Sequence, residues 1–410
     1  MEQSTGLLQN LRADNMRIAI MFTNSDNGKA ATVFRYFDGT LNASAITGIR
    51  NQALSALAAL GEGTYEGLCY YRNSQGACYN NSPADFTAST GSQGDPFFHL
   101  TSAVVRVNPL SDTTTSNANA KWLVLVGSGP TGYDGSSTQT SKVFALEMPK
   151  PWTAGSSLVA TTFPTTDLKA FMGDLVTLDD NLDYRGDVMY FGDVVTGSGT
   201  PAWTGKMYRL STGGGIPTTA AWGLASGTDR VPTVVISSVS CSPSPFPGPT
   251  PVGPVLGAPT LTADDSARIW LFFGTGRYFS PGDKTNADTQ HFFGVKDPVA
   301  SGACMETTTT NCERNDLVDV SSTSVCIVCT GGTTQVSGVA SVTNLHGTST
   351  TTLQGLVQSK DGWVTTLPAS RERIVVSPTV IGGIVFFPSF VPSNDLCTAS
   401  GNSYLYASSI

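Results

Sequence analysis

The sequence has few charged residues and no cluster of basic ones. Only 13% of its 410 residues are charged, 31 of them acidic and 23 basic, which gives a net charge of −8. Nucleic-acid binding requires a face rich in Lys and Arg, so this composition argues against it. The acidic balance favours cation binding, although it is also ordinary for a secreted surface. No apolar run is long enough to cross a membrane.

Long helical patterns are also scarce. The sequence contains 43 Gly residues and recurrent Ser and Thr tracts, and 40% of its residues are hydrophobic. Such a composition suits short strands joined by turns and supplies enough apolar surface for a core. We therefore predict a mainly β fold.

Histidine is rare, and its positions give no indication of catalysis. His99, His291 and His346 are scattered, and none pairs with a nucleophile and an acid at a recognisable spacing. A hydrolase triad assembles in space and so stays open as an alternative. Structural or surface roles are the favoured interpretation, and we predict no catalytic residue.

The eight Cys residues are even in number and partly grouped. Local pairs in loop-rich segments indicate disulfides formed in an oxidising compartment, and a zinc site is the weaker alternative. The grouped pairs are Cys69 with Cys78, Cys304 with Cys312, and Cys326 with Cys329. No signal peptide precedes them. We therefore expect an exported chain that begins inside a longer precursor.

Residues 1–85 predict a small α/β region. Two strands are expected over Arg17–Phe22 and Ala31–Phe37, separated by turn-forming residues. A helix is expected over Ala43–Leu60, because its apolar residues recur at helical spacing. Residues 86–98 are polar and predict a linker.

Residues 99–410 predict a β-propeller-like array of antiparallel blades. Four stretches repeat a pattern of apolar strands, often ending near Gly, and radial repetition of such sheets is typical of propellers. A β-sandwich is the alternative. The four units are expected over 102–146, 171–210, 232–295 and 362–406. The last unit includes a strand at Arg373–Val376.

Two inserts are expected within this array. Residues 242–254 are Pro-rich and predict an extended surface loop, because Pro cannot donate to a sheet ladder. Residues 301–350 are rich in Thr, Ser and Gly and contain four of the Cys residues. They predict an insertion outside the blades that is held by disulfides.

The sharpest local pattern is a nine-residue acidic loop. Side-chain oxygens occupy positions one, three, five and nine, and a backbone carbonyl is expected to fill position seven. These positions are Asp179, Asn181, Asp183, Asp187 and, for the carbonyl, Arg185. Oxygen ligands at alternate positions around a curled chain suit Ca²⁺, so calcium is the predicted cofactor.

Other interpretations of this loop are available. It is not an EF-hand, because position six is Tyr184 rather than Gly and no Glu follows at position twelve. A solvated acidic turn is the alternative to a metal site. Residues 185–187 also spell Arg-Gly-Asp, an integrin-recognition tripeptide, and chance is the favoured explanation for it.

The order of several motifs resembles the PilC/PilY family of type IV pilus tip adhesins. The similar stretches are Asp187–Asp193, Gly205–Leu210, Phe273–Tyr278, Gly362–Trp363 and the region of Cys397. The family carries a nine-residue calcium loop in a propeller-like domain. The resemblance implies that residues 179–187 are that loop and that calcium occupancy influences pilus extension and retraction.

The resemblance further implies a position at the pilus tip or cell surface, reached through the periplasm. The implied partners are minor pilins and a host or abiotic surface. Family members carry a von Willebrand A-like domain, and residues 1–85 resemble part of one, without its Asp-x-Ser-x-Ser metal motif. Four blades are fewer than the family has, so a partner chain completing the ring is one expectation.

Two other function classes are compatible with the sequence. A quinoprotein-like propeller enzyme would have similar Gly- and Trp-rich blades, but adjacent Cys residues are typical of it and none occur here. In a purely structural surface or filament protein, calcium in the loop would only stabilise the fold.

Overall fold

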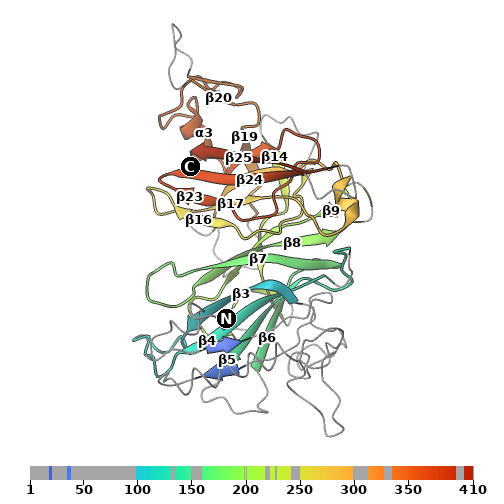
Figure 1. Ribbon diagram of the computed structural model, residues 1–410. Coiled ribbons are helices and arrows are strands. Elements are labelled where there is room, and N and C mark those ends of the chain that lie inside the picture. Colours follow the sequence, from blue (N-terminus) through green and yellow to red (C-terminus); the bar gives the residue numbers. More distant parts are fainter. Residues whose placement is uncertain are drawn as a thin grey trace, which may run out of the picture.

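The computed structural model describes the chain mainly as β-structure (Figure 1). Among the described residues, no helix has both the length and the hydrophobicity needed to cross a bilayer. The residues described are 18–20, 35–37, 98–130, 134–148, 159–197, 199, 201–217, 222–226, 229–241, 250–298, 313–326, 335–393 and 401–409.

A four-stranded and a five-stranded antiparallel sheet form the first half of the described chain. The first runs β3 (Phe98–Val107), β4 (Lys121–Ser128), β5 (Lys142–Met148) and β6 (Val159–Pro164). The second runs β7 (Ala170–Leu178), β8 (Val188–Thr196), β10 (Met207–Ser211) and β13 (Thr233–Ile236), with β9 (Trp203–Thr204) beside β8. The hairpin of β11 (Leu224–Ser226) and β12 (Asp229–Val231) lies between β10 and β13 in the chain.

The second half contains a seven-stranded sheet and a three-stranded sheet. The seven-stranded sheet has the order β15 (Thr250–Pro251), β14 (Ser238–Cys241), β19 (Asp316–Asp319), β22 (Gly362–Thr366), β18 (His291–Lys296), β17 (Ile269–Gly274) and β16 (Thr260–Ala263). The terminal sheet consists of β23 (Thr379–Ile381), β24 (Ile384–Pro392) and β25 (Gly401–Ser409).

A few short elements complete the described structure. The helix α3 (Leu353–Ser359) begins at Thr352, whose side chain accepts from the Gly355 amide. The 3₁₀ turn η3 (Pro281–Lys284) follows β17. Two small antiparallel pairs also occur, β1 (Ile18–Ile20) with β2 (Arg35–Phe37) and β20 (Ser324–Val325) with β21 (Val336–Ser337).

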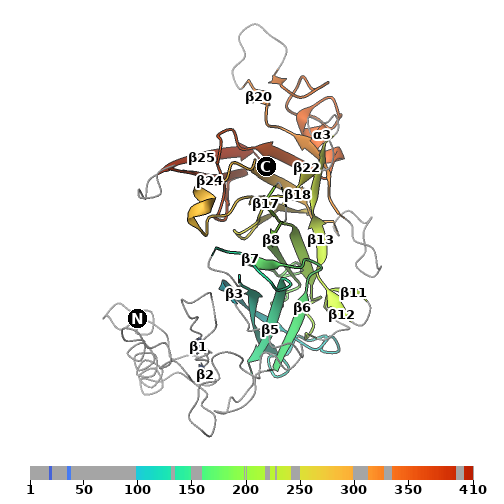
Figure 2. The ribbon, with the colours of Figure 1, turned by 90° about the vertical axis from the view of Figure 1, so that its right-hand side faces the viewer.

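The four larger sheets stack face to face, and each contact between neighbours is a hydrophobic core (Figures 1 and 2). Strand β8 shows why its sequence is apolar throughout. Met189 and Phe191 enter the core shared with the first sheet, whereas Val188 and Tyr190 enter the core shared with the seven-stranded sheet. Because both faces are covered, alternation with polar residues is lost.

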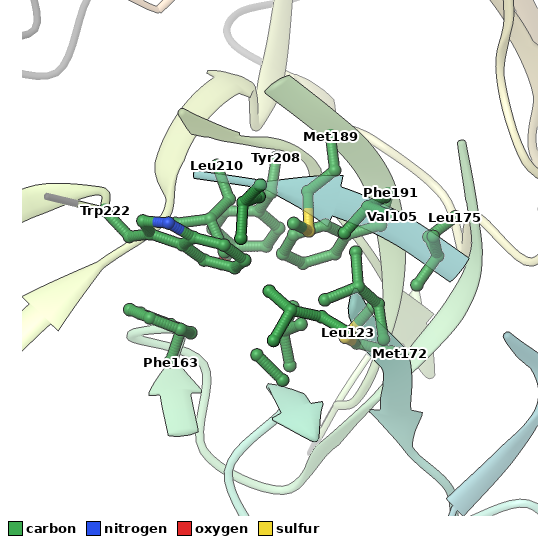
Figure 3. Packing of buried hydrophobic residues seen from close by; sticks show 14 of the residues in the cluster. Val105, Leu123, Phe163, Met172, Leu175, Met189, Phe191, Tyr208, Leu210 and Trp222 are labelled. Atoms are coloured by element: carbon green, nitrogen blue, oxygen red, sulfur yellow. The ribbon is translucent and has the colours of Figure 1, made fainter. Parts of the chain in front are cut away.

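The core between the first two sheets is built on large aromatic side chains (Figure 3). Phe163 stacks on Trp222 with ring centroids 5.1 Å apart, and Phe191 stacks on Tyr208 at 5.5 Å. The Trp222 indole donates to the Gly215 carbonyl at 2.7 Å. The buried indole ring of Trp222 packs between the two sheets, and its N–H has a hydrogen-bond partner, so this residue helps to hold the sheets together.

The sheets do not follow the four predicted units. Strand β13, predicted to begin the third unit, closes the second sheet, and β22, predicted to begin the fourth, lies in the seven-stranded sheet. The pairings of β14 with β19 and of β19 with β22 are parallel, so the blades are not all antiparallel. A continuous apolar run indicates a strand that is buried on both faces, but it does not indicate which strand pairs with it.

The segment Arg373–Val376 is not a strand, contrary to prediction. Its buried Arg373 guanidinium donates to backbone carbonyls of Arg277 and Asn286 at 2.9 and 3.0 Å. Arg373 makes only an isolated bridge to Phe390. The strand forms later, as β23, after Pro378.

The predicted inserts are partly integrated into the seven-stranded sheet. Strand β15 lies within the Pro-rich stretch and pairs with β14, and Val252, which follows it in the same stretch, is fully buried. Strand β19, within residues 301–350, lies between β14 and β22. Residues 242–249, 301–312 and 327–334 fall outside the described residues.

The N-terminal predictions are tested only at two strands. β1 and β2 pair antiparallel, with Ile18 opposite Phe37, within the two segments expected to be strands. The predicted helix, the linker up to residue 97 and the von Willebrand A-like region lie otherwise outside the described residues. Six of the eight cysteines also do, so the disulfide pattern stays a prediction.

Candidate metal centre

The acidic loop joins β7 to β8 in the second sheet, and the hairpin closes tightly beneath it. The Asp187 amide donates to the Leu178 carbonyl at 2.9 Å, which ties the two ends of the loop together. Strand pairing continues at once, with Leu178 opposite Val188. The loop therefore stands on a paired two-stranded base, in which β8 is largely buried and the end of β7 next to the loop is half-buried.

Three carboxylates converge inside this loop. One oxygen each from Asp179, Asp183 and Asp187 lies within 4.8 Å of the others, and all three residues are half-buried. Carboxylate oxygens at such separations are suitable ligands for a hard divalent cation. The three residues thus form a possible metal-binding group, four residues apart along the chain.

Hydrogen bonds to the backbone hold the carboxylates in this arrangement. Asp179 accepts from the amides of Asp183 at 3.1 Å and Tyr184 at 2.7 Å, and Asp187 accepts from the Asp180 amide at 3.0 Å. The Asn181 Oδ1 accepts from the Asp183 amide at 3.0 Å. Each acidic side chain is therefore fixed by the loop itself.

The backbone of the loop adopts left-handed conformations at two bulky residues. Leu182 has φ 59° and Tyr184 has φ 67°, a region that non-Gly residues visit rarely. Both side chains are 82% exposed. The two reversals turn these side chains outward, so Asp183 between them turns inward.

Arg185 is the one cation that the loop itself supplies. Its Nε donates to Asp183 Oδ2 at 2.7 Å, and its guanidinium forms an ion pair with the same carboxylate. This hydrogen bond is the main cause that lowers the pKa of Asp183. Asp183 is therefore held ionised.

Asp187 has the opposite electrostatic character. Burial raises its pKa above the ordinary value, and the nearby charges of Asp183 and Asp179 raise it further. Backbone hydrogen bonds from Asp180 and Asn181 oppose this shift. A bound cation would remove the repulsion among the three carboxylates, because it places positive charge between them.

Strand β3 and the segment after β10 anchor the acidic loop from outside. The Asp187 carbonyl accepts from the amides of Thr212 and Gly213 at 2.7 and 3.1 Å, and Gly186 donates to the Arg106 carbonyl at 2.9 Å. The Arg106 guanidinium donates to the Tyr184 carbonyl at 3.3 Å. Sequence reasoning missed Arg106 and Thr212, because contacts across 26 to 78 residues leave no local pattern.

The structure places the five predicted site residues as follows. Asp179, Asp183 and Asp187 come together, whereas Asn181 is exposed and uses its side-chain oxygen on the Asp183 amide. Arg185 contributes an ion pair by its side chain, a role that the sequence did not predict. Because this guanidinium and the Asp187 carboxylate are both engaged within the loop, the Arg-Gly-Asp tripeptide is not openly presented.

Other buried charges in the stack make structural networks. Asp193 is fully buried and accepts from the Lys206 amide at 2.8 Å and the Ser141 hydroxyl at 3.2 Å. Burial, followed by the neighbouring Asp167, raises its pKa well above the ordinary value. Lys206 in turn pairs with Asp167 at 2.5 Å. This network joins the first two sheets.

The histidines do not gather at a site within the described residues. His291 is buried in β18, and burial lowers its pKa to about 4. His346 is exposed in the segment before α3. The side chain of His99 lies outside the described residues.

Sequence comparison relates the chain to a pilus protein. The type IV pilus biogenesis factor PilY1 homolog of Xylella fastidiosa is 24% identical over 245 residues. The chain is thus similar to a PilY1-type pilus biogenesis factor over this region. The match covers 57% of this chain and 14% of the length of that relative. No protein-family model matches the sequence.

A solved structure of a PilY1 domain is also similar. The C-terminal domain of PilY1 from Pseudomonas aeruginosa matches with a TM-score of 0.45 and 14% sequence identity. The match covers 71% of this chain and 56% of the solved one.

Proposed function

We propose that this chain is a calcium-responsive factor of the type IV pilus, acting by binding and regulation rather than by catalysis. The observation that carries the proposal is the group of three carboxylates in the β7–β8 loop, within 4.8 Å of one another. It occurs in a chain that is 24% identical, over 245 residues, to a type IV pilus biogenesis factor PilY1 homolog.

Calcium is the ion that the donor set fits best. The loop offers only oxygen ligands, which are the ligands of hard cations, and no Cys or His lies within it. Asp179, Asp183 and Asp187 supply carboxylates, Asn181 a neutral oxygen and Arg185 its backbone carbonyl. Calcium tolerates such an irregular shell, whereas Mg²⁺ requires a near-octahedral one.

The proposed array is propeller-like. Three observations support it. The first sheet is a four-stranded antiparallel meander, and the second has a four-stranded antiparallel path with β9 beside β8. In the third sheet, β16, β17, β18 and β22 follow each other antiparallel, and successive sheets stack face to face. In this arrangement the acidic loop lies at one end of the second blade. The proposed location is the cell surface or pilus tip, with minor pilins as partners and attachment to a host or abiotic surface as a consequence.

The proposal predicts that calcium occupancy of the loop controls pilus extension and retraction. The test introduces Asp179→Ala, Asp183→Ala and Asp187→Ala separately into the encoding gene and counts surface pili with calcium present or chelated. Asp180→Ala is the matched control, because Asp180 is an exposed acid of the same loop outside the carboxylate group.

Each of the three variants is expected to show the pilus count of chelated wild-type cells at all calcium levels. The control is expected to respond to calcium as the wild type does. If piliation in all three variants still responds to calcium as in the wild type, the regulatory role is rejected. If the Asp180→Ala control loses the calcium response to the same extent, the effect comes from the overall acidity of the loop rather than from the three carboxylates.

A further inference from the structure

The last strand of the terminal sheet presents a long open edge. β25 pairs with β24 over nine residues, from Gly401 to Ser409, and no second partner is found among the described residues. Leu405 is 71% exposed and Tyr404 45% exposed. The strand contains no Pro and no charged residue, the two devices by which edge strands commonly avoid pairing.

The three central residues of β25 read the same in either direction, and only small or polar residues flank them on both sides. The strand reads Gly-Asn-Ser-Tyr-Leu-Tyr-Ala-Ser-Ser, and its middle residue is Leu405. On either side of the centre come Tyr404 and Tyr406, then Ser403 and Ala407. Two such strands, placed antiparallel about a two-fold axis at Leu405, would match Tyr with Tyr and small residues with small ones.

We propose that β25 is a homodimerisation edge, at which β25 of a second copy of this chain adds in antiparallel register centred on Leu405. The two terminal sheets then form one continuous six-stranded sheet. Such an interface is isologous, so the same strand serves both copies and the assembly closes as a dimer. Main-chain hydrogen bonds supply the pairing, as in other strand additions.

The aromatic side chains of the strand support this register. Tyr406 stacks on Phe387 of β24 at 5.1 Å, and Tyr404 lies 6.4 Å from Tyr406 along the same strand. In the proposed register, Tyr404 lies opposite Tyr406 of the second copy on the same face. Directly opposed aromatic residues stabilise an antiparallel pair. The two half-exposed tyrosine rings would thereby continue a ladder that begins in the core.

The charge distribution of the chain favours contact between two copies at the terminal sheet rather than elsewhere on the surface. The net charge of −8 opposes contact between copies over most of the surface. The strands β23, β24 and β25 contain no charged residue at all. The terminal sheet is therefore a region where two copies meet without like-charge repulsion.

The first experiment measures the mass in solution by sedimentation equilibrium over a range of concentrations. The wild-type chain of 42.9 kDa is expected to move toward twice that mass as concentration rises. Leu405→Lys places two like charges opposite each other at the axis and is expected to give monomers. Leu168→Lys is the matched control, because Leu168 is also 71% exposed but lies outside the terminal sheet; it is expected to dimerise as the wild type does.

A cysteine pair tests the register directly. Leu405→Cys places the two thiols opposite each other, at a Cα separation of about 4.5–5.5 Å that suits a disulfide. Ser409→Cys places them eight residues apart along each strand, about 27 Å, which no disulfide spans. We expect an interchain disulfide with Cys at position 405 and none beyond the wild-type level with Cys at position 409.

Two results would overturn the proposal. One is a wild-type chain that remains monomeric at every concentration without a crosslink at position 405. The other is equal crosslinking at both positions, which would show random collision or a different register. Far-ultraviolet circular dichroism of each variant shows that it is folded, so that loss of the dimer is attributed to the edge.

Discussion

The Nε of Arg185 lies 2.7 Å from Oδ2 of Asp183, so the loop holds its own cation against a carboxylate that a metal would use. The guanidinium and a metal ion therefore compete for the same charge. At the proposed calcium site, the ion would have to displace or share this partner. In this proposal, the competition with Arg185 sets the affinity of the loop for calcium.

Removal of this competitor is expected to strengthen metal binding. In Arg185→Gln the backbone carbonyl is retained, whereas the positive side chain is lost. We predict a several-fold lower dissociation constant for calcium, measured by calorimetry at low ionic strength, where Coulomb interactions are least screened. A weaker or unchanged affinity in this variant would show that Arg185 is not a competitor.

Calcium binding is expected to weaken on acidification at an unusually high pH for carboxylates. The pKa of Asp187 is raised by burial and by the neighbouring acids, so its proton begins to compete with metal above the range of an ordinary Asp. Binding heats measured at stepwise pH values from neutral to 4.5 test this expectation. Constant affinity down to the ordinary range of Asp titration would contradict it.

The same raised pKa has a consequence for the metal-free protein. Because the folded state binds this proton more tightly than the unfolded state, Asp187 contributes stability at low pH that is lost as pH rises through its folded pKa. Added calcium is expected to restore stability at neutral pH. Thermal unfolding of wild type and Asp187→Asn, with and without calcium, measures this: only the wild type should gain stability.

Gly192 is expected to tolerate no side chain. A Cβ at this position would lie 2.3 Å from side-chain atoms of Val255 and 2.7 Å from its carbonyl oxygen. Overpacking a core of this kind costs about 1–3 kcal/mol, so Gly192→Ala should lower the free energy of unfolding by that amount. Gly282→Ala is the control, because its nearest neighbour would be 3.6 Å away. Equal stability of both variants in urea would refute the close packing.

His291 is expected to make the fold acid-sensitive. Burial lowers its pKa to about 4, so between that value and 6.5 the unfolded state binds the proton and the folded state does not. Stability therefore falls as pH drops through this window, by about 3 kcal/mol for this group. Urea unfolding at pH 7 and pH 4.5 should show a smaller loss for His291→Leu than for wild type. An identical loss would exclude His291 as a cause.

The sequence was sufficient for the features that depend on local spacing. Asp179, Asp183 and Asp187 recur every four residues, and the structure brings these side chains together. The mainly β composition and the fully apolar strands were likewise evident. Strand β8 shows the physical reason, because alternate residues enter two different cores.

The sequence did not determine what depends on distant partners. β13 and β22 have the expected strand patterns, but burial on both faces fits either neighbouring sheet equally well. The salt link of Arg185 and the anchoring of the loop by Arg106 and Thr212 depend on side-chain direction and on chain segments far apart in sequence. Arg373 belongs to the same class, since its buried guanidinium serves carbonyls 87 to 96 residues away.

Calcium titration by calorimetry, on the wild type, Asp183→Ala and Asp180→Ala, tests the central claim most directly. We predict binding to the wild type and to Asp180→Ala with similar heats, at a dissociation constant of roughly 10⁻⁴ M or tighter, and none to Asp183→Ala. Equal heats for all three proteins, or no heat for the wild type, would contradict calcium binding at this loop.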